Sequence, residues 1–242
     1  VTVVDQTAPV ITAADQTVVL DGTTGLGSLD VTGISAADNC TGTPTITYSQ
    51  SSFDCDDLGQ ITVTITATDG AAQPNSSTQD ITVTVVDQTA PVITAPATQT
   101  VTLDANGAGT LDVTGVSAAD VCDNTPTLTY TQSTFDCDDV GTVTVTVTAT
   151  DASNNQSTED ITVTVEDNTA PVITAADQTV VLDGTGSGSL DVSGISAADA
   201  CTASPVLSYS QSTFDCTDLG QVTVTITAVD ASNNQSTQDI TV

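Results

Sequence analysis

Aspartate recurs at three kinds of position where carboxylates could act together: before the segment TAPVIT, at the end of the segment AAD, and after a long alternating run. The loops of a β-sandwich gather at its two ends, so the three carboxylates of each set should meet at one end. Calcium takes six to eight oxygen ligands and would turn their repulsion into binding, whereas the alternative is turn capping. The three predicted calcium sets are Asp5, Asp38 and Asp69; Asp87, Asp120 and Asp151; and Asp167, Asp199 and Asp230.

A second acidic group lies in the recurring segments FDCDD, FDCDD and FDCTD. We expect Asp57, Asp139 and Asp218 at the other end of each repeat, where they bind a further metal ion or, as we favour, cap a turn. Asp30 and Asp80 lie at outward strand positions and are expected to be solvated surface charges that discourage edge pairing. Three asparagines could complete the first group of sites with their amide oxygens: Asn39, Asn124 and Asn154.

The six cysteines form three pairs, and the two members of each pair are 15 residues apart. A disulfide within a pair would contribute roughly 3 kcal/mol by constraining the unfolded chain. It would also indicate an oxidising compartment outside the cytoplasm. The alternative is three pairs of free, buried thiols. The predicted disulfides are Cys40–Cys55, Cys122–Cys137 and Cys201–Cys216.

The charge of the chain excludes several functions. It has 31 acidic residues, no Lys, Arg or His, and a formal net charge of -31. Nucleic acid and anionic membranes are therefore poor partners, because both are bound through Lys or Arg. Without His or Lys the usual general bases and amine nucleophiles are absent, and so are His-ligated zinc sites. With three Phe, three Tyr and no Trp, aromatic pocket walls are scarce, and we predict no enzyme activity.

Three similar segments divide the chain. VVDQTAPVIT occurs around Asp5 and Asp87, and VEDNTAPVIT occurs around Asp167, so the spacings are 82 and 80 residues. We predict three repeats, at residues 1–86, 87–166 and 167–242. Residues 1–4 are expected to end the last strand of a preceding repeat, and the third repeat to be truncated in its last strand. The chain thus reads as a piece of a longer protein.

Each repeat carries a period of two, which is typical of half-buried strands. The run ITVTITAT at residues 61–68 places Ile61, Val63 and Ile65 on one face and threonines on the other. About seven short strands in a repeat, each with one buried face, predict an immunoglobulin-like β-sandwich. The fold class is therefore all-β, with three tandem immunoglobulin-like repeats forming an elongated rod. The strand order between Tyr48 and Gln60 stays open.

The recurring segments together resemble a known family. The frame DxTAPVIT, AADNC, FDCDDLG, TVTATDASNN and ITVTVVD is similar to the hyalin repeat (HYR) family, especially its version in very large bacterial surface proteins. The resemblance covers the three repeats nearly end to end. It implies an immunoglobulin-like fold, an extracellular location and a role in adhesion or surface architecture.

We therefore predict a stalk or filament segment of a cell-surface adhesin, secreted and stiffened by calcium and by one disulfide in each repeat. Its partners would be neighbouring repeats of the same long chain, without insertion into a membrane. One alternative is a filament subunit whose repeats contact other chains. Another is that the outward threonine rows bind carbohydrate or ice, although threonine is also simply a good strand former.

Overall fold

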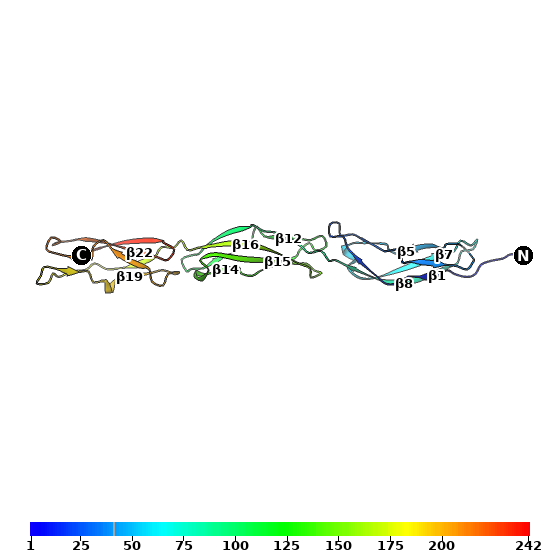
Figure 1. Cartoon of the computed structure of the whole chain (residues 1–242), viewed down its shortest axis with the longest axis horizontal. Helices are drawn as coiled ribbons and strands as arrows, with labels where there is room; N and C mark the ends of the chain where they lie inside the picture. The colour runs from blue at the N-terminus through cyan, green and yellow to red at the C-terminus, as the bar shows by residue number, and fades with distance from the viewer. Residues whose placement is uncertain (41) are drawn as a thin grey trace. The chain divides into compact units, whose positions relative to one another are not determined.

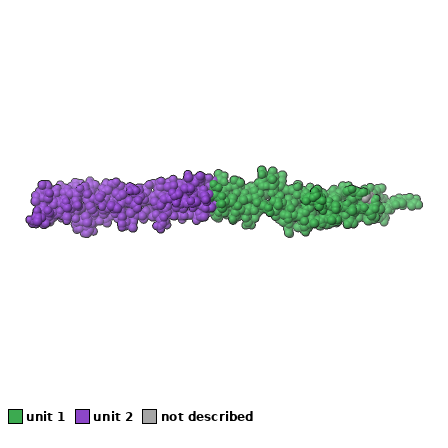
Figure 2. Space-filling view, in the orientation of Figure 1, with its two compact units in different colours: residues 1–94, 117–129, 148–159 green, residues 95–116, 130–147, 160–242 purple. Residues whose placement is uncertain are grey.

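The computed structural model of the chain describes residues 1–40 and 42–242. These residues form two compact units (Figure 2). Unit 1 comprises residues 1–94, 117–129 and 148–159, and unit 2 comprises residues 95–116, 130–147 and 160–242. The second predicted repeat therefore contributes to both units. Within the described residues no helix combines the length and the hydropathy needed to cross a bilayer.

The first repeat lies wholly in unit 1, and its sequence of short and long strands follows the alternating runs (Figure 1). Two short strand pairs, β1 with β4 and β3 with β6, accompany a four-stranded sheet of order β2-β8-β7-β5. Its elements are β1 (Val10–Thr12), β2 (Gln16–Val19), β3 (Gly27–Ser28), β4 (Ser35–Ala37), β5 (Thr45–Tyr48), β6 (Ser52–Phe53), the 3-10 helix η1 (Cys55–Asp57), β7 (Gly59–Thr68) and β8 (Ser76–Val86).

Strands β7 and β8 form the centre of this sheet. They pair antiparallel along their length, while β2 pairs parallel with the last residues of β8. On β7 the side chains alternate, so that Val63, Ile65 and Ala67 are fully buried and the intervening threonines face outward. The period of two in the sequence is thus the period of a pleated strand with one face in the core.

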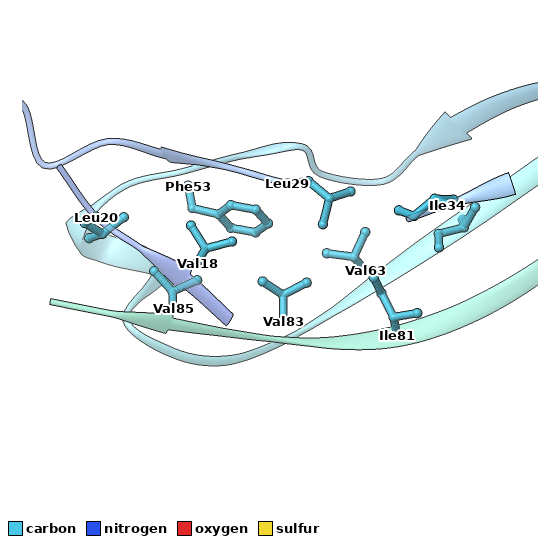
Figure 3. Packing of buried hydrophobic residues seen from close by; sticks show 10 residues of the cluster. Val18, Leu20, Leu29, Ile34, Phe53, Val63, Ile81, Val83 and Val85 are labelled. Atoms are coloured by element: carbon cyan, nitrogen blue, oxygen red, sulfur yellow. The ribbon is translucent and has the colours of Figure 1, made fainter. Parts of the chain in front are cut away.

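The core of the first repeat is aliphatic around one aromatic ring. Phe53 is 1% exposed and, with Leu29, faces Val18, Val63 and Val83 across the interior (Figure 3). Phe135 and Phe214 are buried at the matching places of the other repeats. Two strand layers therefore enclose one core, which is the definition of a β-sandwich.

The segment whose strand order stayed open in the sequence contains one two-residue strand and one helical turn. Strand β6 pairs with β3, and η1 follows directly. The Asp54 carboxylate accepts a hydrogen bond from the Asp56 N–H, and the Asp57 carboxylate accepts one from the Asp54 N–H. This capping box satisfies the N–H groups that a helix start leaves unpaired.

The second repeat has the same strand arrangement. Its four-stranded sheet has the order β10-β16-β15-β13, and β9 pairs with β12 while β11 pairs with β14. Its elements are β9 (Val92–Thr94), β10 (Thr98–Thr102), β11 (Gly109–Thr110), β12 (Ser117–Ala119), β13 (Thr127–Tyr130), β14 (Thr134–Phe135), η2 (Cys137–Asp139), β15 (Gly141–Thr150) and β16 (Gln156–Glu166).

The third repeat, in unit 2, has a three-stranded sheet of order β20-β22-β23. The N–H of Gln178 still donates to the carbonyl of Thr241 at 3.0 Å, as the matching parallel strands do in the other repeats. Its elements are β17 (Val172–Thr174), β18 (Gly188–Ser189), η3 (Val192–Gly194), β19 (Ser196–Ala198), β20 (Val206–Tyr209), β21 (Thr213–Phe214), β22 (Thr223–Val229) and β23 (Gln235–Thr241).

The chain is thus an all-β protein of tandem β-sandwich repeats. The repeat boundaries at residues 86 and 166 remain a prediction. Residues 1–4 are exposed and form no strand in the structure, and their assignment to the last strand of a preceding repeat also remains a prediction. A segment without a hydrogen-bonded neighbour does not hold a strand conformation.

Candidate functional site

Three strand ends place the central set of carboxylates. Asp87 follows β8, Asp120 follows β12 and Asp151 follows β15, and all three lie in unit 1. One carboxylate oxygen of each lies within 4.8 Å of the others. Asp87 and Asp151 are buried, at 6% and 5% exposure. The sets Asp5, Asp38 and Asp69, and Asp167, Asp199 and Asp230, are grouped in the same way.

An asparagine that sequence reasoning missed ties two members of each set together. In the central set the Asn155 amide donates to the Asp151 carboxylate at 2.8 Å and to the Asp87 carbonyl at 3.2 Å. Its backbone N–H also donates to Asp151, at 2.7 Å. Asn75 and Asn234 do the same in the other sets.

The asparagine named from the sequence was the neighbouring one, Asn154. That residue turns the backbone with a φ of 68°, and its counterpart Asn233 has the same φ. Such a left-handed conformation suits asparagine among the non-glycine residues. The signal that could have found Asn155 is the spacing of four residues from the strand-ending aspartate, shared by Asn234.

The aspartate of the AAD segment uses its two oxygens differently. Asp120 Oδ1 accepts hydrogen bonds from the N–H groups of Cys122 and Asp123, at 2.9 and 3.0 Å. Asp120 Oδ2 is buried and has no hydrogen-bond partner, and the same holds for Oδ2 of Asp199 and of Asp5. Buried polar atoms are rarely left without a partner, so each such oxygen is a candidate to contact a cation or a water molecule. The grouped atoms are carboxylate oxygens, a type of ligand that calcium prefers.

No side chain of this protein can neutralise these carboxylates, because the chain has no Lys, Arg or His. Two full charges about 4 to 5 Å apart repel by on the order of 3 to 4 kcal/mol at an effective dielectric constant near 20. Hydrogen bonds offset part of this cost: the Asn75 amide above all lowers the pKa of Asp69. The negative charge of Asp5, with burial and then Asp38, raises the pKa of the Cys40 thiol.

The acidic residues of the other end cap turns. Asp57 Oδ2 accepts hydrogen bonds from the Gln50 amide at 2.8 Å and from the Asp54 N–H at 3.1 Å. Asp139 and Asp218 have the matching partners. None of the three belongs to a group of three metal-capable side chains within the described residues. The geometry therefore favours the turn-capping interpretation.

The predicted disulfides were wrong in their pairing. The structure joins Cys55 to Cys122 and Cys137 to Cys201, with Cα–Cα distances of 5.1 and 4.9 Å, and leaves Cys40 and Cys216 free and exposed. Each disulfide therefore joins one predicted repeat to the next. Both members of the first bond lie in unit 1 and both members of the second lie in unit 2.

The length of strand β7, which follows Cys55 and ends near Asp69, explains this error. Cys40 lies beside Asp38, which is grouped with Asp69 directly after β7, whereas Cys55 lies in η1, just before β7 begins at Gly59. Ten strand residues at about 3.3 Å each put these ends roughly 30 Å apart. A disulfide needs Cα atoms within about 7 Å. The fifteen residues from Cys40 to Cys55 therefore do not form a closed loop, because they run from one end of the sandwich to the other.

A glycine lies against the disulfide in the loop between β2 and β3. Gly25 has a φ of +67°, and a Cβ added there would lie 2.8 Å from Cys55 Sγ and 3.4 Å from a Val121 methyl. Gly107 has the same relation to Cys137 and Cys201, with a φ of +74°. Both backbone conformation and close approach require glycine here.

We expect Gly25→Ala to lower the free energy of unfolding by about 1 to 2 kcal/mol from the left-handed backbone alone. The contact with Cys55 should also reduce the fraction of chains that form the Cys55–Cys122 bond. Chemical unfolding and peptide mapping of the oxidised protein measure the two effects. The control is Gly33→Ala, because nothing lies within 4 Å of a Cβ there. Equal behaviour of the two variants would contradict the prediction.

Tandem β-sandwiches joined by disulfides define a class of extracellular repeat proteins, because such bonds form and persist in oxidising compartments. The chain is 30% identical over 252 aligned residues to "Hyalin" of Strongylocentrotus purpuratus, and the match covers all of this chain and 21% of that protein. This similarity supports a hyalin-repeat-like relationship. The chain spans about a fifth of the length of this relative. No family model matches.

Solved structures of other proteins are also similar to this chain. Sidekick-1 immunoglobulin domains 1–5 match at 11% identity with a TM-score of 0.43, over 97% of this chain and 58% of that one. Mouse Cadherin-23 EC22-24 matches at 13% identity with a TM-score of 0.36, over 97% of this chain and 98% of that one.

Proposed function

We propose that this chain is a stalk segment of a cell-surface adhesion protein, in which calcium and a disulfide together stiffen each junction between repeats. The role is structural rather than enzymatic. The observation that carries the proposal is that the two carboxylate oxygens of Asp120 have different surroundings. Its Oδ1 holds the N–H of Cys122, the cysteine bonded to the preceding repeat, while its buried Oδ2 points to no protein partner.

The placement of Asp87 supports the same function. Asp87 directly follows β8 and begins the segment that connects β8 to β9. It belongs to the carboxylate set with Asp120 and Asp151. An ion bound there would fix the connecting segment to two loops of the following repeat. The disulfide fixes the same two repeats at Cys55 and Cys122. Two independent links between neighbours are what a spacer needs to transmit position along a chain.

Similarity to a sea-urchin hyalin supports the extracellular architecture but is neutral on the source. The bacterial surface-protein setting rests on the sequence resemblance alone. Carbohydrate or ice binding by the threonine rows has less support, because the hydroxyl of Thr64 already donates to Asp80 at 2.7 Å. Thr146 and Thr225 donate to Asp160 and Asp239 in the same way. Asp80 is thus a cross-strand partner rather than only a solvated charge.

Thermal unfolding with excess calcium and with chelator, at matched ionic strength and with intact disulfides, tests the proposal. A ligand at 100 times its dissociation constant stabilises the folded state by about 2.7 kcal/mol for each site. For a chain of this size we expect a rise in the midpoint of about ten degrees. Magnesium should not reproduce the rise, because it demands a smaller octahedral shell. Identical midpoints with calcium and chelator would leave the carboxylates as turn caps.

A further inference from the structure

One end of the first repeat carries both a bonded cysteine and a member of a carboxylate set. Cys55 begins η1, just before β7, and Asp87 directly follows β8. The antiparallel register pairs Gly59, at the start of β7, with Val85, near the end of β8. Cys55 and Asp87 therefore lie at the same end of the sandwich.

A single loop of the second repeat, residues 120–123, carries the partners of both. Asp120 belongs to the carboxylate set of Asp87, and Cys122 is bonded to Cys55. Asp120 Oδ1 accepts the N–H of Cys122 at 2.9 Å. The group that would bind the ion and the sulfur that forms the bond are thus fixed to each other within three residues.

A second contact connects this loop to the third member of the set. The Asp123 carboxylate accepts a hydrogen bond from the Ala152 N–H at 3.0 Å, and Ala152 directly follows Asp151. In the third repeat Thr202 takes the place of Asp123, and its hydroxyl accepts the N–H of Ala231 at the same 3.0 Å. A different side chain therefore makes the same contact between the cysteine loop and the carboxylates.

The second disulfide has the same neighbours. Cys201 is bonded to Cys137, and its N–H donates to Asp199 at 2.9 Å. Asp199 is grouped with Asp230 and with Asp167, which directly follows β16. The two arrangements lie in different units, so each is a reference for the other in a single molecule.

An ion and a disulfide would connect the same two segments, although the two links are chemically distinct. Without a cation the carboxylates of Asp87 and Asp120 repel each other, which drives the connecting segment away from the loop that carries Cys122. A bound ion attracts both and holds Cys122 beside the end of the repeat that carries Cys55. One link between two segments raises the effective concentration for the second. Each link therefore lowers the entropy cost of forming the other.

We propose that each junction is a redox-sensitive calcium site, in which the bound ion and the disulfide stabilise each other. This inference rests on the calcium sites of the proposed function. Coupling between two equilibria is reciprocal, so calcium favours the disulfide by the same factor by which the disulfide tightens calcium binding. A dithiol that reduces the bond supplies two electrons and two protons, leaves two cysteine thiols and becomes a cyclic disulfide. That reduction should weaken calcium binding at the same junction.

The disulfide equilibrium of the whole chain measures the coupling. The protein is equilibrated with mixtures of reduced and oxidised dithiothreitol, with saturating calcium or with chelator at matched ionic strength. Alkylation and peptide mass spectrometry then give the reduced fraction at each junction. We expect calcium to raise the ratio of reduced to oxidised dithiothreitol at half reduction by about tenfold at both junctions, a usual size for coupled sites. Magnesium should raise it much less.

Asp120→Asn tests whether the effect passes through the carboxylate set. In this variant the calcium dependence should largely disappear for the bond of Cys122 and remain for the bond of Cys201. The matched control is Asp57→Asn, since Asp57 lies two residues from Cys55 but belongs to none of the carboxylate sets in the described part of the chain. It should keep the calcium dependence of both bonds. An Asp120→Asn chain that lost the dependence at both bonds, or at neither, would overturn the proposal.

Calorimetric titration with calcium separates this inference from the proposed function. The oxidised chain is compared with the double variant Cys55→Ser and Cys122→Ser, in which one site should bind calcium about tenfold more weakly. Equal affinities in the two proteins would overturn the coupling and leave the calcium sites in place. Absence of calcium binding in both would overturn the coupling and the calcium sites together.

Discussion

Replacing Cys55 and Cys122 together by serine should lower the free energy of unfolding by about 4 kcal/mol, because the bond closes a loop with a sequence separation of 67 residues. The chain-entropy contribution of this loop exceeds that of the short loop expected from the sequence by only about 1 kcal/mol, because it grows with the logarithm of loop length. Chemical unfolding of the oxidised protein, with hydrogen exchange at residues 117–129, measures the global and local parts of the effect. We expect faster exchange around Asp120 in the variant.

The matched control is the double variant Cys40→Ser and Cys216→Ser. These cysteines are exposed and form no disulfide within the described residues, so their loss should change the stability of the protein by no more than about 0.5 kcal/mol. If both double variants were destabilised equally, the contribution would come from the sulfur atoms and not from the bond. If neither were destabilised, the sandwich cores alone would determine the stability.

Replacing Asp120 by asparagine should change the stability in opposite directions with and without calcium. In chelator the substitution removes one of three close negative charges, and the midpoint of thermal unfolding should rise. With saturating calcium it removes a charged ligand, and stability should fall by about 2 to 3 kcal/mol relative to the wild type. The shape of the side chain and its capping of Cys122 are kept, since the asparagine oxygen can still accept that hydrogen bond.

Asp139→Asn is the matched control for this reversal. Asp139 also accepts a backbone hydrogen bond, from the Asp136 N–H, but it lies in η2 and belongs to none of the carboxylate sets found among the described residues. Its substitution should have the same small effect with calcium and with chelator. If Asp120→Asn behaved in the same way, the buried oxygen of Asp120 would not be a metal ligand. Calorimetric titration should further show one fewer bound calcium in the Asp120 variant.

Local patterns in the sequence predicted those features of the structure that are determined within a single strand. The alternation in residues 61–68 placed Val63 and Ile65 in the core, and both are fully buried. The grouping of Asp87 with Asp120 and Asp151 was also accessible, because each residue ends a strand at the same side of a sandwich. Register in a strand is fixed by its buried face, so patterns of this kind carry three-dimensional information.

The pairing of the cysteines depended on contacts that no single repeat contains. Cys55 and Cys40 are close in sequence, but β5 and β6 lie between them and carry the chain from one end of the sandwich to the other. The true partner, Cys122, is reached only through the junction between two repeats. Asn155 was missed for a related reason: the choice between two adjacent asparagines depends on which one adopts the left-handed backbone, here Asn154.

The parallel pairing of β2 with the end of β8 determines how the first repeat responds when its two ends are pulled apart. Residues 16–19 lie alongside residues 83–86, so a pull toward the two termini slides the strands past each other. Their hydrogen bonds are then loaded in shear and must break together rather than one after another. Between the first and second repeats, the Cys55–Cys122 disulfide is a second covalent connection beside the backbone at Asp87, and it can carry part of the force. The disulfide therefore limits how far the segment between β8 and β9 can extend when the chain is pulled.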